Sequence, residues 1–128
     1  MNPGLSLTLL AGNLAVCQLP ADAQIPDWAY SGELSVIVRT RDELSLVCEQ
    51  HFVPAQIRVE KNWRAFKVQG PLDFSQVGVL AALAQSLAQA KVSIFAISTF
   101  DTDYVLVKEH SIDLAVQALR QSGFHVST

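Results

Sequence analysis

Polar side chains with complementary charges are concentrated around two turns in the second half of the chain. Ser98 and Thr99 supply hydroxyl groups at the end of one apolar run, and Asp101 and Asp103 supply carboxylates before the next. Carboxylates accept hydrogen bonds from ammonium and guanidinium groups. The expected helix start within residues 69–79 presents free backbone N–H groups and the positive end of a helix dipole, which suit a carboxylate. Together the two turns complement the two charged groups of an amino acid.

The turn before the first expected helix supplies further candidate residues. Asp73 can cap this helix, and Gln76, three residues later, completes a variant of the capping box. Gly78 falls in the first turns of the helix, where its missing side chain permits close approach by a ligand or by another backbone. A purely structural role stays open for the polar residues of both turns, because Asp, Ser and Thr are ordinary turn residues.

The elements that position these turns follow from the periodicity of the second half. One helix is expected after Asp73, and a second is expected from Ser111 to Gly123. The apolar stripe of the first helix consists of Val77, Leu80, Ala81, Ala84, Leu87 and Ala88. Strands are expected over 63–69, 92–98, 103–108 and 124–126, and the run 92–98 is apolar on both sides, as in a central strand. The resulting order is βαββαβ, the ferredoxin-like unit, in which two helices cover one face of an antiparallel sheet.

The first half is a fainter copy of the same pattern. Residues 35–49 repeat the order of apolar run, Thr-x-Asp turn and apolar run that is found in residues 97–109. We also expect a hairpin of 5–10 with 16–19, a single helical turn at 27–30, and a connection between the halves at 51–62. The sequence therefore predicts an α+β protein of two ferredoxin-like units with antiparallel sheets, residues 1–60 and 61–128, the first with reduced helices.

Composition narrows the class of protein. Half of the 128 residues are hydrophobic, 16% are charged and the formal net charge is −3, as in an ordinary folded domain. Nucleic acid is not an expected partner, because Lys61, Arg64 and Lys67 fit a solvated strand face better than a basic stripe. No run approaches the ~18 apolar residues of a membrane span. Residues 5–19 lack basic flanks and are interrupted at Gly12, which argues against a signal peptide and for a cytoplasmic protein.

The residues that could support catalysis or bind a metal are scattered. Cys17 and Cys48 lie in separate apolar runs without metal-ligand spacing, and a buried structural thiol is the favoured interpretation of each. His51, His110 and His125 show no helical or strand spacing to one another, and no nucleophile elbow, zinc motif or phosphate loop is present. We therefore expect a protein that is not an enzyme and that has no catalytic residues, metal or cofactor.

The segment around the second turn resembles the ACT domain, most closely the tandem ACT modules of the aspartokinase and CASTOR (arginine-sensor) type. The resemblance is strong across residues 62–124 and weaker but consistent over 5–50. The matching residues are Ile97-Ser98-Thr99-Phe100, Thr102-Asp103-Tyr104 and Leu106-Val107, preceded by Asp73-Phe74 and Val77-Gly78-Val79-Leu80-Ala81.

The resemblance implies that a small molecule, often an amino acid, binds at an interface between ACT units and acts allosterically. By position, Gln76, Val77, Gly78 and Leu80 would line the pocket from the helix start. Thr99, Phe100 and Asp103 would line it from the strand end, with Asp103 as the acceptor for a cationic group. Gln76 occupies a position where arginine sensors have an acidic residue, which does not favour arginine itself.

The leading hypothesis is a non-catalytic regulatory or sensor protein that binds an amino acid. The alternative is a protein–protein assembly module with a vestigial pocket. Because this chain has one pair of ACT units where the eukaryotic sensors have two, the resemblance also implies a homodimer. A regulated activity would belong to another protein, which makes a partner protein a further expectation.

Overall fold

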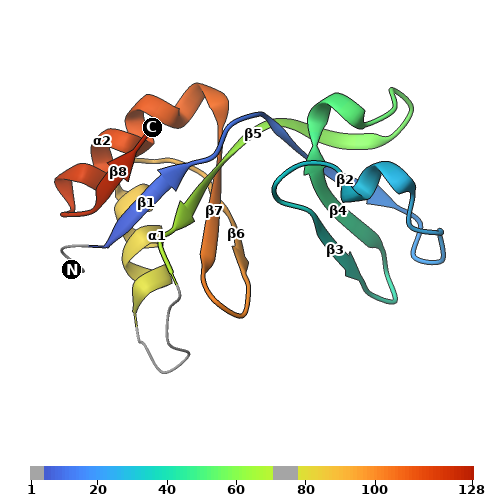
Figure 1. Cartoon of the computed structure of the whole chain (residues 1–128), viewed down its shortest axis with the longest axis horizontal. Coiled ribbons are helices and arrows are strands. Elements are labelled where there is room, and N and C mark those ends of the chain that lie inside the picture. The colour runs from blue at the N-terminus through green and yellow to red at the C-terminus, as the bar shows by residue number, and fades with distance from the viewer. Residues whose placement is uncertain (1–4, 71–77) are drawn as a thin grey trace. The chain divides into compact units, whose positions relative to one another are not determined.

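The computed structural model describes residues 5–70 and 78–128, which form two compact units (Figure 1). Residues 12–63 form one unit, and residues 1–11 and 64–128 form the other. The expected boundary between residues 60 and 61 lies close to the boundary of these units. The main difference is that residues 1–11 were expected in the first unit and are assigned to the second. The first strand of the chain, β1 (Ser6–Leu9), belongs to the second unit because it pairs with β5 and β8 there.

The unit of residues 12–63 has the ferredoxin-like order with its helices reduced to single turns. Its elements are β2 (Leu14–Leu19), the 3-10 turn η1 (Asp27–Tyr30), β3 (Val36–Arg39), β4 (Leu44–Glu49), the 3-10 turn η2 (Gln50–Phe52) and the first half of β5 (Arg58–Val68). The strand order is β3-β4-β2-β5, and every pair is antiparallel. Ala29 of η1 packs on the buried sheet residues Ala15, Cys17, Leu44 and Leu46, so this short turn covers the sheet face in place of a helix. The expected helical turn at 27–30 and the strands around residues 40–43 are confirmed.

The second unit has the same plan with full helices and one additional strand. After β5 follow α1 (Val79–Gln89), β6 (Phe95–Ser98), β7 (Asp103–Lys108), the 3-10 turn η3 (Glu109–Ser111), α2 (Ile112–Gln121) and β8 (His125–Ser127). The strand order is β6-β7-β5-β1-β8, with β1 inserted between β5 and β8. One continuous core joins both helices to the same face of the sheet. Its members include Leu83, Leu87, Ala115 and Leu119 from the helices and Leu7, Phe66, Val68, Val105 and Val107 from the strands. The predicted fold class is confirmed.

Several expectations about individual elements were wrong. Residues 5–10 and 16–19 do not form a hairpin, because β1 and β2 each pair with β5, at different parts of that strand. Residues 51–62 are not only a connection, because β5 already begins at Arg58. β6 is not a central strand: within the described residues it pairs only with β7.

The first helix also differs from its expected form. It begins at Val79 rather than near Asp73, because its N-cap Gly78 has a φ of 87°, which no α-helix continues through. Its buried residues are Val79, Leu83, Ser86 and Leu87, so the buried face is rotated from the expected stripe, of which Ala81 and Ala88 are exposed. The second helix agrees with expectation: Ala115, Val116 and Leu119 are buried, and Ser111 is the N-cap.

A backbone irregularity lies where β5 passes from one unit to the other. Asn62 has a φ of 68°, and the register between β2 and β5 shifts between Leu14 and Val16. The Asn62 N–H donates to Gln50 Oε1 at 2.6 Å, and Gln50 Nε2 donates to Asn62 Oδ1 at 3.1 Å. Asn is one of the few residues that adopt this left-handed conformation at low cost. The side chain of Gln50 therefore satisfies the backbone group that the bulge removes from the ladder.

Candidate functional site

The turn between β6 and β7 carries the polar residues that the sequence singles out. Ser98 and Asp103 are direct partners across the two antiparallel strands. The Ser98 hydroxyl donates to Asp103 Oδ1 at 2.6 Å, a short hydrogen bond to a charged acceptor. Ser98 is exposed and Asp103 is half-buried. The carboxylate is therefore held in one orientation at the surface, and its remaining lone pairs can accept hydrogen bonds from a cationic group.

Two threonines close this turn and attach it to the neighbouring strand. The Thr99 N–H donates to the Thr102 carbonyl at 2.8 Å, and the Thr102 N–H donates to Thr99 Oγ1 at 3.2 Å. The buried Thr102 hydroxyl donates to the carbonyl of Val68, the last residue of β5, at 2.6 Å. This contact fixes the turn beside the point where the chain leaves β5 toward α1. Thr102 was not among the predicted site residues, although it lies within the sequence motif.

The first unit contains the same turn with different chemistry. The Thr40 N–H donates to the Glu43 carbonyl at 2.9 Å, and the Glu43 N–H donates to Thr40 Oγ1 at 3.2 Å, as Thr99 and Thr102 do. The repeated Thr-x-Asp pattern therefore reflects a repeated turn. The residues that flank it differ, because Arg39 and the fully buried Leu44 stand where the second unit has Ser98 and Asp103. At these two positions the first unit therefore lacks the hydroxyl–carboxylate pair, and its own hydroxyl–carboxylate contact is one from Ser45 Oγ to Glu43 Oε1 at 3.0 Å.

The residues predicted at the start of the first helix are only partly described by the structure. Asp73, Gln76 and Val77 lie outside the described residues. Gly78 is exposed, and a Cβ at this position would meet no atom within 4 Å, so its role there is conformational. Its carbonyl accepts the first helical hydrogen bond, from Ala82 N at 2.9 Å. Leu80 is half-buried and packs against the core between the helices and the sheet.

The structure thus brings part of the predicted set together. Ser98, Thr99 and Asp103 share the β6–β7 turn, joined by hydrogen bonds within the turn. Phe100 is at the tip of the same turn with 79% of its surface exposed. Leu80 contributes to the core instead. The arrangement can bind a cationic group through Asp103.

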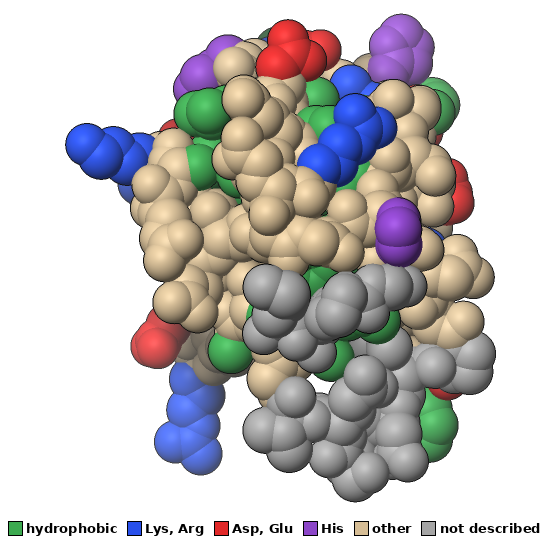
Figure 2. Space-filling model, turned by 90° about the vertical axis from the view of Figure 1, so that its left-hand side faces the viewer, with side chains coloured by type: hydrophobic (Ala, Val, Ile, Leu, Met, Phe, Trp, Pro, Cys, Tyr) green, Lys and Arg blue, Asp and Glu red, His purple; other side chains and the backbone are tan. Residues whose placement is uncertain are grey.

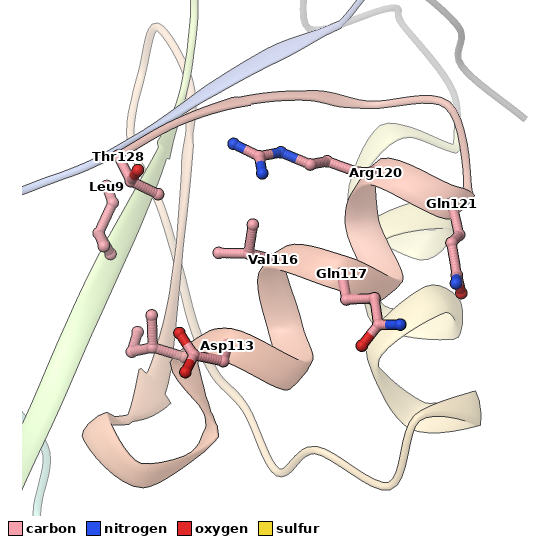
Figure 3. A pocket seen from close by; sticks show the side chains of 8 residues that line it. Leu9, Asp113, Val116, Gln117, Arg120, Gln121 and Thr128 are labelled. Atoms are coloured by element: carbon pink, nitrogen blue, oxygen red, sulfur yellow. The ribbon is translucent and has the colours of Figure 1, made fainter.

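A separate hollow of about 530 Å³ lies against the flank of α2 (Figure 3). Its lining includes Asp113, Val116, Gln117 and Arg120 from α2, together with Leu9 at the end of β1 and Thr128. None of these residues was predicted as part of a site, because the polar residues of α2 suit a solvated helix face and Val116 suits the core.

The two cysteines lie on the same face of the first unit's sheet. Cys17 pairs with Leu46 and Cys48 pairs with Ala15 across β2 and β4, which places the thiols diagonally. Both are free and buried, as expected, and they hydrogen-bond each other. This hydrogen bond, and then burial, raises the pKa of Cys17 well above its ordinary value. Within residues 5–70 and 78–128, no group of three or more His, Cys, Asp or Glu side chains is arranged to hold a metal ion.

Among the described helices, none is long and apolar enough to span a membrane.

Solved structures share this fold. The crystal structure of a protein from Agrobacterium tumefaciens has 34% sequence identity and a TM-score of 0.92, over 98% of this chain and 93% of that chain. The aspartokinase alpha and beta subunits align at 17% identity with a TM-score of 0.65, over 91% of this chain and 96% of that chain. The regulatory subunit of aspartate kinase from Thermus thermophilus aligns at 10% identity with a TM-score of 0.60, over 86% of this chain and 91% of that chain.

Curated relatives include cytosolic arginine sensors. Subunit 1 of the human cytosolic arginine sensor for mTORC1 is 41% identical over 64 residues, which are 48% of this chain and 20% of that protein. The rat protein is 30% identical over 110 residues, which are 81% of this chain and 32% of that protein. The chain thus spans about a third or less of these relatives.

Family models match both parts of the chain. A model of an N-terminal domain matches residues 12–56, and the model described as ACT domain matches residues 58–121, which is half of the chain. The match covers α1, the β6–β7 turn and α2. The chain belongs to the ACT domain family.

Proposed function

We propose that this protein is a non-catalytic regulator that binds an amino acid at the β6–β7 turn of its second unit, where that turn meets another ACT unit. The observation that carries the proposal is the Ser98–Asp103 pair, held at 2.6 Å in a turn that Thr102 attaches to β5. Similarity to an arginine sensor and to regulatory parts of aspartokinases supports the regulatory role. The cytosolic relatives support a cytoplasmic location.

The chemistry of the turn narrows the ligand to a molecule with a cationic group. Asp103 already accepts one hydrogen bond from Ser98, and the remaining lone pairs of its carboxylate can accept hydrogen bonds from a positively charged donor. Because Arg39 and Leu44 replace this pair in the first unit, we propose one ligand site per chain. The protein is proposed to act as a homodimer and to pass the signal of binding to a partner protein.

Thermal unfolding in the presence of each of the twenty amino acids tests the proposal. A ligand that binds only the folded state at 100 times its Kd stabilises that state by about 2.7 kcal/mol. We expect at least one amino acid to raise the melting temperature of the wild type. The same amino acid should leave the melting temperature of Asp103→Asn unchanged. Asp101→Asn removes a carboxylate from the same turn and is the matched control, which should respond like the wild type. The site is misplaced if Asp103→Asn also responds like the wild type.

The exposed side chain of Phe100 favours the assembly module as the second candidate function. An aromatic ring with 79% exposure at the tip of a closed turn is suited to insertion into a partner protein. This function predicts that no amino acid stabilises the chain and that capture of a partner is lost in Phe100→Ala. Stabilisation by an amino acid that depends on Asp103 would exclude it.

A further inference from the structure

The last strand of the second unit leaves an open edge. β8 pairs in parallel with β1, and His125 N donates to the Leu5 carbonyl at 2.9 Å. Because successive residues of a strand direct their backbone groups to opposite sides, the N–H and C=O of Val126 point away from β1. Within the described residues no strand pairs with this edge. Instead, Arg120 Nη2 donates to the Val126 carbonyl at 2.7 Å, and its guanidinium blocks the addition of another strand there.

The helix α2 lies between this edge and α1. On one flank, the Ala118 carbonyl accepts a hydrogen bond from Ser86 of α1 at 3.1 Å. The opposite flank borders the 530 Å³ hollow, where Val116 and Arg120 point toward Leu9 and Thr128 (Figure 3). This flank of α2, defined by Asp113, Val116, Gln117 and Arg120, is called the outer flank below.

The charges of the outer flank are few and ordered. Asp113 and Arg120 are the charged residues of α2, and α1 has none. Charged side chains are also sparse and spread apart over the side of the molecule on which the two helices lie (Figure 2). Arg120 lies seven positions after Asp113, which places the two residues about 10 Å apart along the helix with Val116 and Gln117 between them. The Asp113 carboxylate makes no hydrogen bond or ion pair with another described residue.

This pattern is complementary to itself under one operation. If a second α2 is laid antiparallel on the outer flank, Asp113 of each helix faces Arg120 of the other, and Val116 of each faces Gln117 of the other. A parallel arrangement would place like charges together. Arg120 has five N–H donors and can bond Val126 and a carboxylate at the same time. Self-complementarity of one patch is what a two-fold interface requires.

We propose that a second copy of this chain docks on the outer flank, with the two α2 helices antiparallel about a two-fold axis between Val116 and Gln117. This inference rests on the homodimer of the proposed function and names its surface. The two symmetric pairs of Asp113 with Arg120 fix how the two α2 helices align. The second chain then covers the apolar wall of the hollow. The ligand turn contributes no residue to it.

Sedimentation velocity of the full chain over a range of concentrations tests the surface through charge reversal. We expect the wild type to dimerise, and Asp113→Arg and Arg120→Glu each to raise the dimer Kd by about tenfold or more, which corresponds to about 1.4 kcal/mol. The double variant, Asp113→Arg with Arg120→Glu, restores both pairs and should return the Kd to within about threefold of the wild type. Asp22→Arg changes the net charge by the same amount as Asp113→Arg at an exposed position outside both the outer flank and the β6–β7 turn, and it should leave the Kd unchanged. Circular dichroism confirms that each variant is folded.

The possible failures separate the surface from the homodimer. A wild type that stays monomeric at every concentration overturns both the homodimer and the outer flank as its surface. A dimer whose Kd does not respond to either single reversal leaves the homodimer standing and overturns the outer flank. Weakening by both single reversals without recovery in the double variant overturns the antiparallel register.

Discussion

Replacing Thr102 by valine tests whether this buried hydroxyl holds the candidate site in place. Valine has nearly the same shape as threonine and removes only the hydroxyl that donates to the Val68 carbonyl at 2.6 Å. Thr102 is 6% exposed, so water cannot readily replace the lost donor. An acceptor left unsatisfied in a buried position costs about 1–3 kcal/mol. We expect Thr102→Val to lower the free energy of unfolding by about 2 kcal/mol.

Thr102→Ser is the matched variant, because it keeps the hydroxyl and loses a methyl group. Its expected cost is about 0.8 kcal/mol, the value of one buried CH₂ group. Urea unfolding followed by circular dichroism gives both free energies, with the m-value as a check that the unfolded states are comparable. The reasoning is refuted if Thr102→Val matches the wild type within about 0.5 kcal/mol, or if Thr102→Ser is as unstable as Thr102→Val.

Two further predictions concern the first unit. Asn62→Ala should lower the free energy of unfolding by about 1–2 kcal/mol because alanine is strained at a φ of 68°, whereas Asn62→Gly should lower it less. Chemical unfolding of the two variants measures both losses. Equal losses would contradict the idea that Asn62 is needed for its left-handed conformation. The raised pKa of Cys17 means that the folded state keeps a proton which the unfolded state releases above about pH 9. The contribution of Cys17 to stability is therefore present below about pH 9 and is lost as the pH rises further, whereas the pKa of Cys48 is lowered by the same hydrogen bond. The free energy of unfolding should therefore fall more steeply from pH 9 to 10.5 in the wild type than in the double variant Cys17→Ala with Cys48→Ala. Equal slopes would show that the thiol pair ionises equally in both states.

The sequence predicted the buried face of a helix best where the spacing of its apolar residues allowed one interpretation. Ala115, Val116 and Leu119 lie among polar residues, so the buried face of α2 could be assigned. In α1 the sequence Val79–Gln89 contains several alanines, which are compatible with burial or exposure. The apolar period therefore did not fix the rotation of the helix. Its start depended on a positive φ at Gly78, and a glycine in a sequence indicates that such a conformation is permitted but not that it occurs.

Strand pairing was less predictable than strand existence. Gly12 does form a turn with a φ of 84°, as its type suggests, yet the strands on either side of it pair with different halves of β5. A local turn signal cannot specify a partner some fifty residues away. The beginning of β5 was hidden because Arg58 and Lys61 are exposed on a strand and look like a polar connection in the sequence. Residues 92–98 were apolar enough for a central strand, and periodicity alone does not distinguish that position from an edge.

The two copies of the β-turn indicate how one site per chain would arise from a duplicated unit. Both turns keep the threonine that accepts the backbone N–H three residues later, so the backbone geometry does not depend on a ligand. In the first unit, the guanidinium of Arg39 donates to the carbonyls of Ala21 and Ala23, and Leu44 enters the core. These positions stabilise the loop and the sheet of a unit that has lost its helices. The second unit has two full helices over its core, so Ser98 and Asp103 need not serve packing and can remain polar at the surface. Under the proposed function, the single ligand site of the chain would follow from this asymmetry of the cores.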